Sequence, residues 1–122
     1  MRLGIDLMAA GELDRLGERG WFRRYIFAES ETAEAAAMAP SRRREFLAGR
    51  FAAKEAVLKV LGRGLFQGVR PADIRLAREP GGAPSVCLGA TAAEAARAAG
   101  LTGVTVSLTH KADLVAAVAV GW

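Results

Sequence analysis

The sequence of 122 residues contains a single cysteine, Cys87, and a single histidine, His110. One cysteine cannot form an intrachain disulfide, so the sequence fits a reducing compartment, and we expect the cytoplasm. Zinc sites built from clusters of cysteine and histidine are excluded on the same ground. A hard metal ion held by carboxylate oxygens is still compatible with this composition.

Long apolar runs are also missing, although hydrophobic residues make up 52% of the chain. The longest candidate, LVAAVAV at 114–120, is far shorter than the ~18 residues that a membrane-spanning helix needs. Asp6 lies where a secretion signal requires apolar residues. We therefore expect residues 1–122 to form one globular domain that neither crosses a membrane nor is secreted.

Positive charge is concentrated in one part of the chain. Residues 42–70 contain eight lysine and arginine residues and two acidic residues, which gives this segment a charge of +6 against +4 for the whole chain. Such a local field favours a polyanionic partner: a nucleic acid, a phosphorylated cofactor or an acidic protein. A solvated helix surface without any partner would carry the same charge, so charge alone does not separate these alternatives.

The hydrophobic pattern predicts an α+β fold, with a largely antiparallel sheet packed against one long helix and shorter helices. The long helix is predicted from Ser41 to about Leu61, and Pro40 is predicted to end the helix before it. The other predicted helices are 11–19, 21–28, 30–38 and 91–100, and the predicted strands are 2–8, 73–77, 85–89, 104–110 and 114–120. The strands 73–77 and 85–89 flank PGGAP and are expected to form a hairpin.

The first predicted strand alternates between two kinds of side chain. Leu3, Ile5 and Leu7 share one face, and Gly4 and Asp6 share the other. This alternation is typical of a strand whose apolar face covers a core, so the simplest expectation for Asp6 is a solvated position on the opposite face.

The long helix carries charged residues at helical spacing. Phe51, Glu55 and Lys59 are four residues apart and share one stripe, while Arg50 and Lys54 form the adjacent stripe. An ordinary surface ion pair between Glu55 and Lys59, worth only ~0.3–0.5 kcal/mol, explains part of this pattern.

A second interpretation joins this helix to the first strand. Asp6 and Glu55 would hold one magnesium ion together if the strand and the helix pack against each other, because magnesium takes one or two carboxylates with waters and phosphate oxygens. The neighbouring cations would then neutralise the remaining phosphate charge.

Three segments of the chain resemble holo-(acyl carrier protein) synthases, the small type of 4′-phosphopantetheinyl transferase. Gly4-Ile5-Asp6 matches the opening strand of that family, and residues 49–56 with Lys59 match its central helix, Gly-Arg-Phe-Ala-x-Lys-Glu-Ala followed by a lysine. Residues 106–110, Val-Ser-Leu-Thr-His, match a segment before its last strand. The central helix is the most specific of the three, and the segments occur in the family's order over nearly the whole chain.

The resemblance implies an activity and a set of roles. Members transfer the phosphopantetheine arm of coenzyme A to a serine of an apo acyl carrier protein and release adenosine 3′,5′-bisphosphate. Asp6 and Glu55 would bind magnesium, and Lys59 would contact the pyrophosphate and stabilise or protonate the leaving group. The residues expected to bind coenzyme A are Arg50, at the nucleotide end, with Lys54, Lys59, Thr109 and His110, and also Gly82 and Pro84 of a neighbouring chain, since members form homotrimers.

The same resemblance implies a surface for the acidic carrier protein. Arg23 and Arg24 are candidates for docking it, and so is Arg15, which stands nine residues after Asp6, about three further than in the family. Lys111 follows the histidine where some relatives have an acidic residue, so a carboxylate base is not expected there.

Two other functions compete with this one. A basic module without catalysis would bind phosphate groups or nucleic acid, but aromatic residues are not interleaved with the cations, as single-strand stacking requires, and no groove-reading motif is present. We therefore expect no nucleic-acid partner. A magnesium-dependent phosphohydrolase would instead release phosphate without any carrier protein.

Overall fold

The computed structural model describes all 122 residues. Its strands are β1 (Arg2–Ala9), β2 (Ile74–Arg78), β3 (Pro84–Leu88), β4 (Val104–Lys111) and β5 (Leu114–Gly121). Its α-helices are α1 (Leu13–Leu16), α2 (Gly20–Ile26), α3 (Glu29–Ala36), α4 (Pro40–Val60) and α5 (Ala90–Ala98), and two short 3₁₀ helices are η1 (Ala10–Glu12) and η2 (Pro71–Asp73). None of the helices is both long enough and apolar enough to span a membrane.

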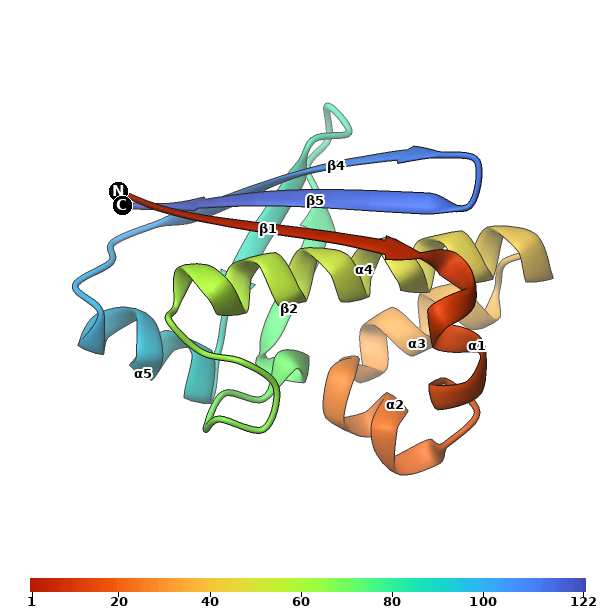
Figure 1. Cartoon of the computed structure of the whole chain (residues 1–122), viewed down its shortest axis with the longest axis horizontal. Helices are drawn as coiled ribbons and strands as arrows, with labels where there is room; N and C mark the ends of the chain where they lie inside the picture. The colour runs from red at the N-terminus through yellow and green to blue at the C-terminus, as the bar shows by residue number, and fades with distance from the viewer.

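The strands form two antiparallel sheets. The larger sheet has the order β1-β5-β4, and β2 pairs only with β3 in a separate hairpin. Helix α4 runs along one face of the larger sheet, with the hairpin and the short helices on its other sides, and the two chain ends lie together (Figure 1). The α+β fold with antiparallel strands around one long helix, including the hairpin at PGGAP, is therefore confirmed.

Helix α4 begins one residue earlier than the pattern indicated. Pro40 occupies its first position rather than ending the helix before it, because proline lacks only an N–H that has no partner in the first helical turn. The helix ends at Val60, and Gly62 then takes a left-handed conformation with φ of +73°.

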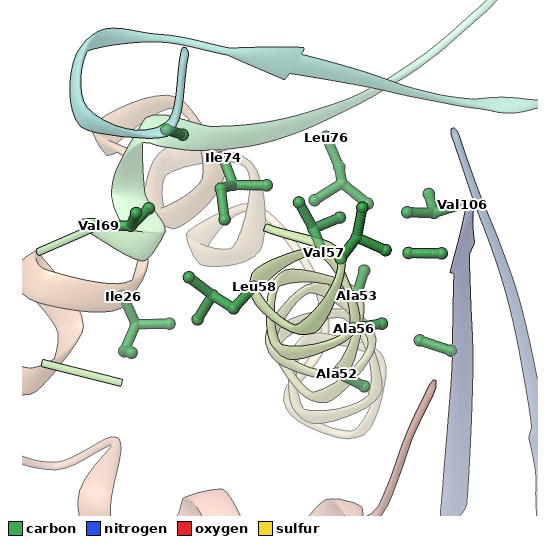
Figure 2. Close-up of a cluster of buried hydrophobic side chains, with 14 of the residues drawn as sticks. Ile26, Ala52, Ala53, Ala56, Val57, Leu58, Val69, Ile74, Leu76 and Val106 are labelled. Carbon is green, nitrogen blue, oxygen red and sulfur yellow. The ribbon is translucent and has the colours of Figure 1, made fainter. Parts of the chain in front are cut away.

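The core surrounds the middle of α4. Ala52, Ala53 and Ala56 are fully buried, and their small side chains let the larger sheet approach the helix closely. Figure 2 shows Val57 of the same helix pointing toward Leu76 of β2, and Leu58 extending toward Ile26 of α2. Burying apolar side chains of this size contributes ~1.5–3 kcal/mol each, so α4 holds both sheets together.

Strand β1 faces the opposite way from the prediction. Leu3, Ile5 and Leu7 are 69%, 63% and 66% exposed, while Gly4 is buried and Asp6 is partly buried. A Cβ atom at Gly4 would collide with the backbone oxygen of Ala56, so only glycine lets β1 lie this close to α4. The expectation that the apolar face covers the core is wrong, and Asp6 is turned toward the helix instead.

Candidate active site

Asp6 of β1 and Glu55 and Lys59 of α4 come together where the strand crosses the helix. The Lys59 Nζ donates a hydrogen bond of 2.6 Å to the Ile5 carbonyl oxygen and lies 3.5 Å from Asp6 Oδ1. The Asp6 side chain is 17% exposed and that of Lys59 is 49% exposed, so the cluster is open to solvent on the lysine side. The structure thus brings the three residues together, as the sequence pattern indicated.

The two carboxyl groups of this cluster are poorly neutralised. Burial raises the pKa of Asp6 above its usual value, and Lys59 opposes that rise only in part. Burial also raises the pKa of Glu55, the charge of Asp6 raises it further, and Lys59 again acts in the opposite direction. In addition, Glu55 Oε1 is buried without a hydrogen-bond partner. Buried polar atoms normally have partners, so this oxygen is available to a ligand.

A divalent cation fits these observations. The chain contains no group of three or more histidine, cysteine, aspartate or glutamate side chains that could hold a metal ion alone. Asp6 and Glu55 can therefore provide only part of a coordination shell, and magnesium is the common ion that takes one or two carboxylates and completes its shell with waters and phosphate oxygens. The unpartnered oxygen of Glu55 and the mutual repulsion of the two carboxyl groups are what such an ion would relieve.

A cavity of about 250 Å³ opens beside the N-terminal half of α4. Its polar lining residues are Arg42, Glu45 and Arg50 of α4, Arg78 of β2, and Thr109 and His110 of β4. His110 Nε2 lies 2.8 Å from Glu45 Oε1, and Arg42 lies 3.6 Å from the same carboxylate oxygen. We refer to this space as the basic cavity.

Three of the expected cofactor-binding residues line the basic cavity. They are Arg50, Thr109 and His110, which come from elements far apart in the sequence. Gly82 and Pro84 do not line it, and their expected contact with a neighbouring chain's cofactor stays a prediction. Arg42 and Arg78 were not singled out in the sequence. Arg42 belongs to the basic run, but no spacing rule links Arg78 to α4.

Lys54 is buried and does not line the basic cavity. Its side chain is 1% exposed, and its Nζ donates hydrogen bonds to the backbone oxygens of Pro71 (2.9 Å) and Ile74 (2.6 Å). The same Nζ lies 2.7 Å from Glu31 Oε1. Burial lowers the pKa of Lys54, and the nearby Glu31 carboxylate opposes that shift. The expected contact of Lys54 with coenzyme A does not fit this placement, because all three partners of the ammonium group are internal.

The arginines expected to dock a carrier protein are exposed and lie on α1 and α2. Arg15 is at the end of α1, and Arg23 and Arg24 are in the last turn of α2. Arg23 and Arg24 also line a cavity of about 450 Å³, together with Arg70, which the sequence did not single out.

Comparison with a family model and with sequence relatives identifies the class of protein to which the chain belongs. Residues 2–119 match the family model of the 4′-phosphopantetheinyl transferase superfamily. A holo-[acyl-carrier-protein] synthase of Nitratidesulfovibrio vulgaris (strain DP4) is 41% identical over 124 residues, which cover 97% of this chain and 94% of the relative. One from Desulforudis audaxviator (strain MP104C) is 38% identical over 122 residues, covering 97% and 89%.

Solved structures agree with the sequence relatives. The crystal structure of the holo-[acyl-carrier-protein] synthase from Neisseria meningitidis matches with a TM-score of 0.85 and 26% identity, covering 98% of this chain and 96% of that one. The synthase from Bacillus anthracis str. Ames, in complex with CoA (3′,5′-ADP), matches with a TM-score of 0.79 and 28% identity, covering 98% and 93%. The chain therefore belongs to the holo-(acyl carrier protein) synthase family, enzymes that transfer phosphopantetheine from coenzyme A to an acyl carrier protein.

Proposed function

We propose that the chain transfers the 4′-phosphopantetheine arm of coenzyme A to a serine of an apo acyl carrier protein at the Asp6–Glu55–Lys59 cluster. The observation that carries the assignment of the site is the pair of poorly neutralised carboxyl groups, with Glu55 Oε1 buried and unpartnered. Two such groups beside a solvent-exposed ammonium suit a pyrophosphate bound through a metal ion.

The residues of the cluster divide the chemistry between them. Asp6 and Glu55 would hold magnesium, which supplies positive charge to the reacting phosphate and to the leaving group. Lys59 has three N–H donors, of which one is used on the Ile5 carbonyl and another faces Asp6, which leaves a donor for a phosphate oxygen. Its charge would stabilise the adenosine bisphosphate as it leaves.

Coenzyme A would extend from this cluster into the basic cavity. The Bacillus anthracis relative was solved with CoA (3′,5′-ADP), which supports a nucleotide site on this fold. Arg50, Thr109 and His110 line the cavity and are the residues that we assign to the nucleotide end. Lys54 does not line the cavity, and we assign its buried side chain to the core.

The carrier protein would dock on the arginines of α1 and α2. Arg15, Arg23 and Arg24 are exposed and make no ion pair within the chain, so their charge is available to an acidic helix. Rim charges of this kind mainly accelerate encounter and are screened by salt. We propose the cytoplasm as the compartment, since Cys87 is free and exposed.

A homotrimer is the assembly that we propose. The face of β1 and β5 that points away from α4 exposes several large apolar side chains: Leu3, Ile5, Leu7, Leu114 and Val118. Contiguous apolar patches are uncommon on monomers and mark interaction sites. Light scattering after size exclusion should give three times the chain mass, and Ile5→Lys should lower it. A wild-type mass equal to one chain would contradict the assembly.

The assignment of Asp6 and Glu55 is tested by removing one charge at a time. Asp6→Asn and Glu55→Gln should each lower the rate of phosphopantetheine transfer by at least ~100-fold at saturating magnesium, because each takes charge away from a metal-held transition state. Transfer is measured by mass spectrometry of the carrier protein. Near-normal rates in either variant would contradict the shared metal site.

Thermal unfolding provides a readout that does not depend on activity. Magnesium at ten times its Kd should stabilise the wild type by about 1.4 kcal/mol. It should not stabilise Glu55→Gln. The raised pKa of Glu55 means that its ionised form weakens the fold as pH rises through that pKa. Without magnesium, Glu55→Gln should therefore be at least as stable as the wild type at pH 7, which separates loss of the metal from misfolding.

A further inference from the structure

One guanidinium group joins three elements that are far apart in the sequence. Arg44 of α4 donates two hydrogen bonds to the Asp14 carboxylate of α1, from Nε to Oδ1 at 3.1 Å and from Nη2 to Oδ2 at 3.2 Å. Its third nitrogen, Nη1, donates a hydrogen bond of 3.0 Å to Oδ1 of Asp113, in the turn between β4 and β5. We refer to these three residues as the Arg44 network.

The geometry of the Arg44 network is that of an ordered contact. Its three side chains are exposed, and exposed ion pairs usually contribute little to stability. Paired arginine–carboxylate hydrogen bonds and networks of several charges are the exceptions, because the planar guanidinium fixes the direction of both bonds. The backbone supports the same arrangement, since the Ala10 N–H donates a hydrogen bond of 2.8 Å to the Asp113 carbonyl oxygen.

Gly11 leaves room for the guanidinium against the chain that leads into α1. A Cβ atom at this position would come within 2.8 Å of Arg44 Nη2, so a larger residue would push the guanidinium away from Asp14. The contact therefore depends on a residue without a side chain as well as on the two aspartates.

Helix α1 depends on other elements for its position. It is only one turn long, and a helix this short is not stable in isolation. Leu13 is its only buried residue, which fixes the depth of the turn but not its rotation about that side chain. Asp14 follows Leu13 directly and so points about 100° further around the helix axis. Its pair with Arg44 therefore supplies the second fixed point, which sets the direction of Arg15.

The Arg44 network lies between the arginines that we assign to carrier docking. A cavity of about 390 Å³ opens between α1, α2 and α4, and Asp14 and Arg44 line it together with Arg23 of α2. Arg15 is the next residue after Asp14 on α1. A change in the angle of α1 would therefore alter the spacing between Arg15 and Arg23.

We propose that Arg44 is a positioning residue for the transfer reaction: through Asp14 it holds α1 at the angle that lets Arg15 meet the acidic carrier protein. This inference rests on the proposed function, and it does not require Arg44 to touch the carrier. The network has two carboxylates against one guanidinium, so its own charge is negative and does not attract an acidic partner. Its contribution to docking is the placement of Arg15.

Replacing Asp14 separates positioning from direct attraction, because the two predict opposite signs. Asp14→Asn removes a negative charge, which would raise kcat/KM for the carrier protein if the surface acted by charge alone. If Asp14 holds α1, the same change should lower kcat/KM for the carrier at least ~5-fold, and Arg44→Gln should do likewise. Affinity for coenzyme A, measured by calorimetry, should stay within about twofold in both variants, since neither residue lines the basic cavity.

Arg97→Gln is the matched control for the loss of one exposed cation. Arg97 lies in the last turn of α5 and makes no ion pair in the chain. Its replacement should change kcat/KM for the carrier by no more than about twofold. A normal or increased kcat/KM in Asp14→Asn, or an Arg44→Gln variant that matches this control, would overturn the inference.

A double variant tests whether Arg44 acts through Arg15. Arg15→Gln with Arg44→Gln should lie no more than about twofold below Arg15→Gln alone, because α1 then has no docking cation left to present. Effects that multiply would show that the two residues act separately, and would overturn the inference. An Arg15→Gln variant with normal kcat/KM for the carrier would overturn it too.

Hydrogen exchange followed by NMR gives a readout that does not depend on transfer. The Gly17 N–H donates a hydrogen bond of 2.7 Å to the Leu13 carbonyl oxygen across α1, and it should exchange at least ~5-fold faster in Arg44→Gln than in the wild type. The amides of residues 52–58, inside α4, should keep their exchange rates, which separates loosening of α1 from loss of the fold. Unchanged exchange at Gly17 would contradict the inference. If the wild type transfers no phosphopantetheine to any apo carrier protein, the proposed function fails, while exchange still decides whether Arg44 holds α1.

Discussion

Lys54→Met is expected to destabilise the protein strongly, because it removes one half of a buried ion pair. Glu31 is 2% exposed and lies 2.7 Å from Lys54 Nζ, and its only other cation, Arg50, is 3.6 Å away. Without Lys54 the carboxylate is left poorly neutralised in the core, and the backbone oxygens of Pro71 and Ile74 lose their donor. Breaking such a pair costs about 3–5 kcal/mol. For a domain of this size, that corresponds to a fall in Tm of roughly 12–20 °C.

Urea unfolding followed by circular dichroism measures this change. Lys59→Met is the matched control, since Lys59 lies on the same helix but is 49% exposed, and it should shift the free energy of unfolding by less than ~1 kcal/mol. The double variant Glu31→Gln with Lys54→Met should recover part of the loss, because it removes the unpaired carboxylate from the core. The recovery stays incomplete because Arg50 then loses the carboxylate that lies 3.6 Å from its Nε atom. A Lys54→Met variant as stable as the wild type but with weaker coenzyme A binding would refute this reasoning and return Lys54 to the ligand site.

Two further predictions concern the exposed cations. Lys59→Met should lower kcat for transfer more than it raises the Kd for coenzyme A, because the Lys59 ammonium acts mainly on the leaving group. Steady-state transfer assays measure kcat, and calorimetry measures the Kd. An unchanged kcat would reassign Lys59 to ground-state binding. Arg23→Glu with Arg24→Glu should raise the KM for the carrier protein and leave coenzyme A affinity within about twofold, and the wild-type rate at low carrier concentration should fall as salt rises from ~50 to ~300 mM. Carrier titrations that superimpose for the variant and the wild type would show that these arginines do not dock it.

The sequence predicted the elements well because their signals are local. The apolar periodicity of α4 and the alternation in β4 and β5 depend on residues within one element, and PGGAP marks its own turn. The orientation of β1 was missed because it depends on a contact between elements. Gly4 fits against the Ala56 backbone, and that fit, rather than the apolar face of the strand, decides which side meets the helix.

The candidate site was likewise predictable where it depends on residues within one element, and not where it depends on contacts between elements. Spacing on α4 correctly grouped Glu55 with Lys59, since positions four apart share a stripe. The same rule could not show that the adjacent stripe is covered by α3 and the η2 segment, which bury Lys54 against Glu31 and two backbone oxygens. Arg78 gave no signal at all, because its place beside Arg50 exists only once the β2–β3 hairpin has folded against α4.

The most direct test of the account is the mass of an apo acyl carrier protein after incubation with this protein, coenzyme A and magnesium. Transfer predicts that the intact carrier gains the mass of one 4′-phosphopantetheine group, that adenosine 3′,5′-bisphosphate appears in equal amount, and that chelating the magnesium or replacing Glu55 by glutamine prevents both. A carrier of unchanged mass, with phosphate released from coenzyme A instead, would contradict the transferase and indicate a hydrolase.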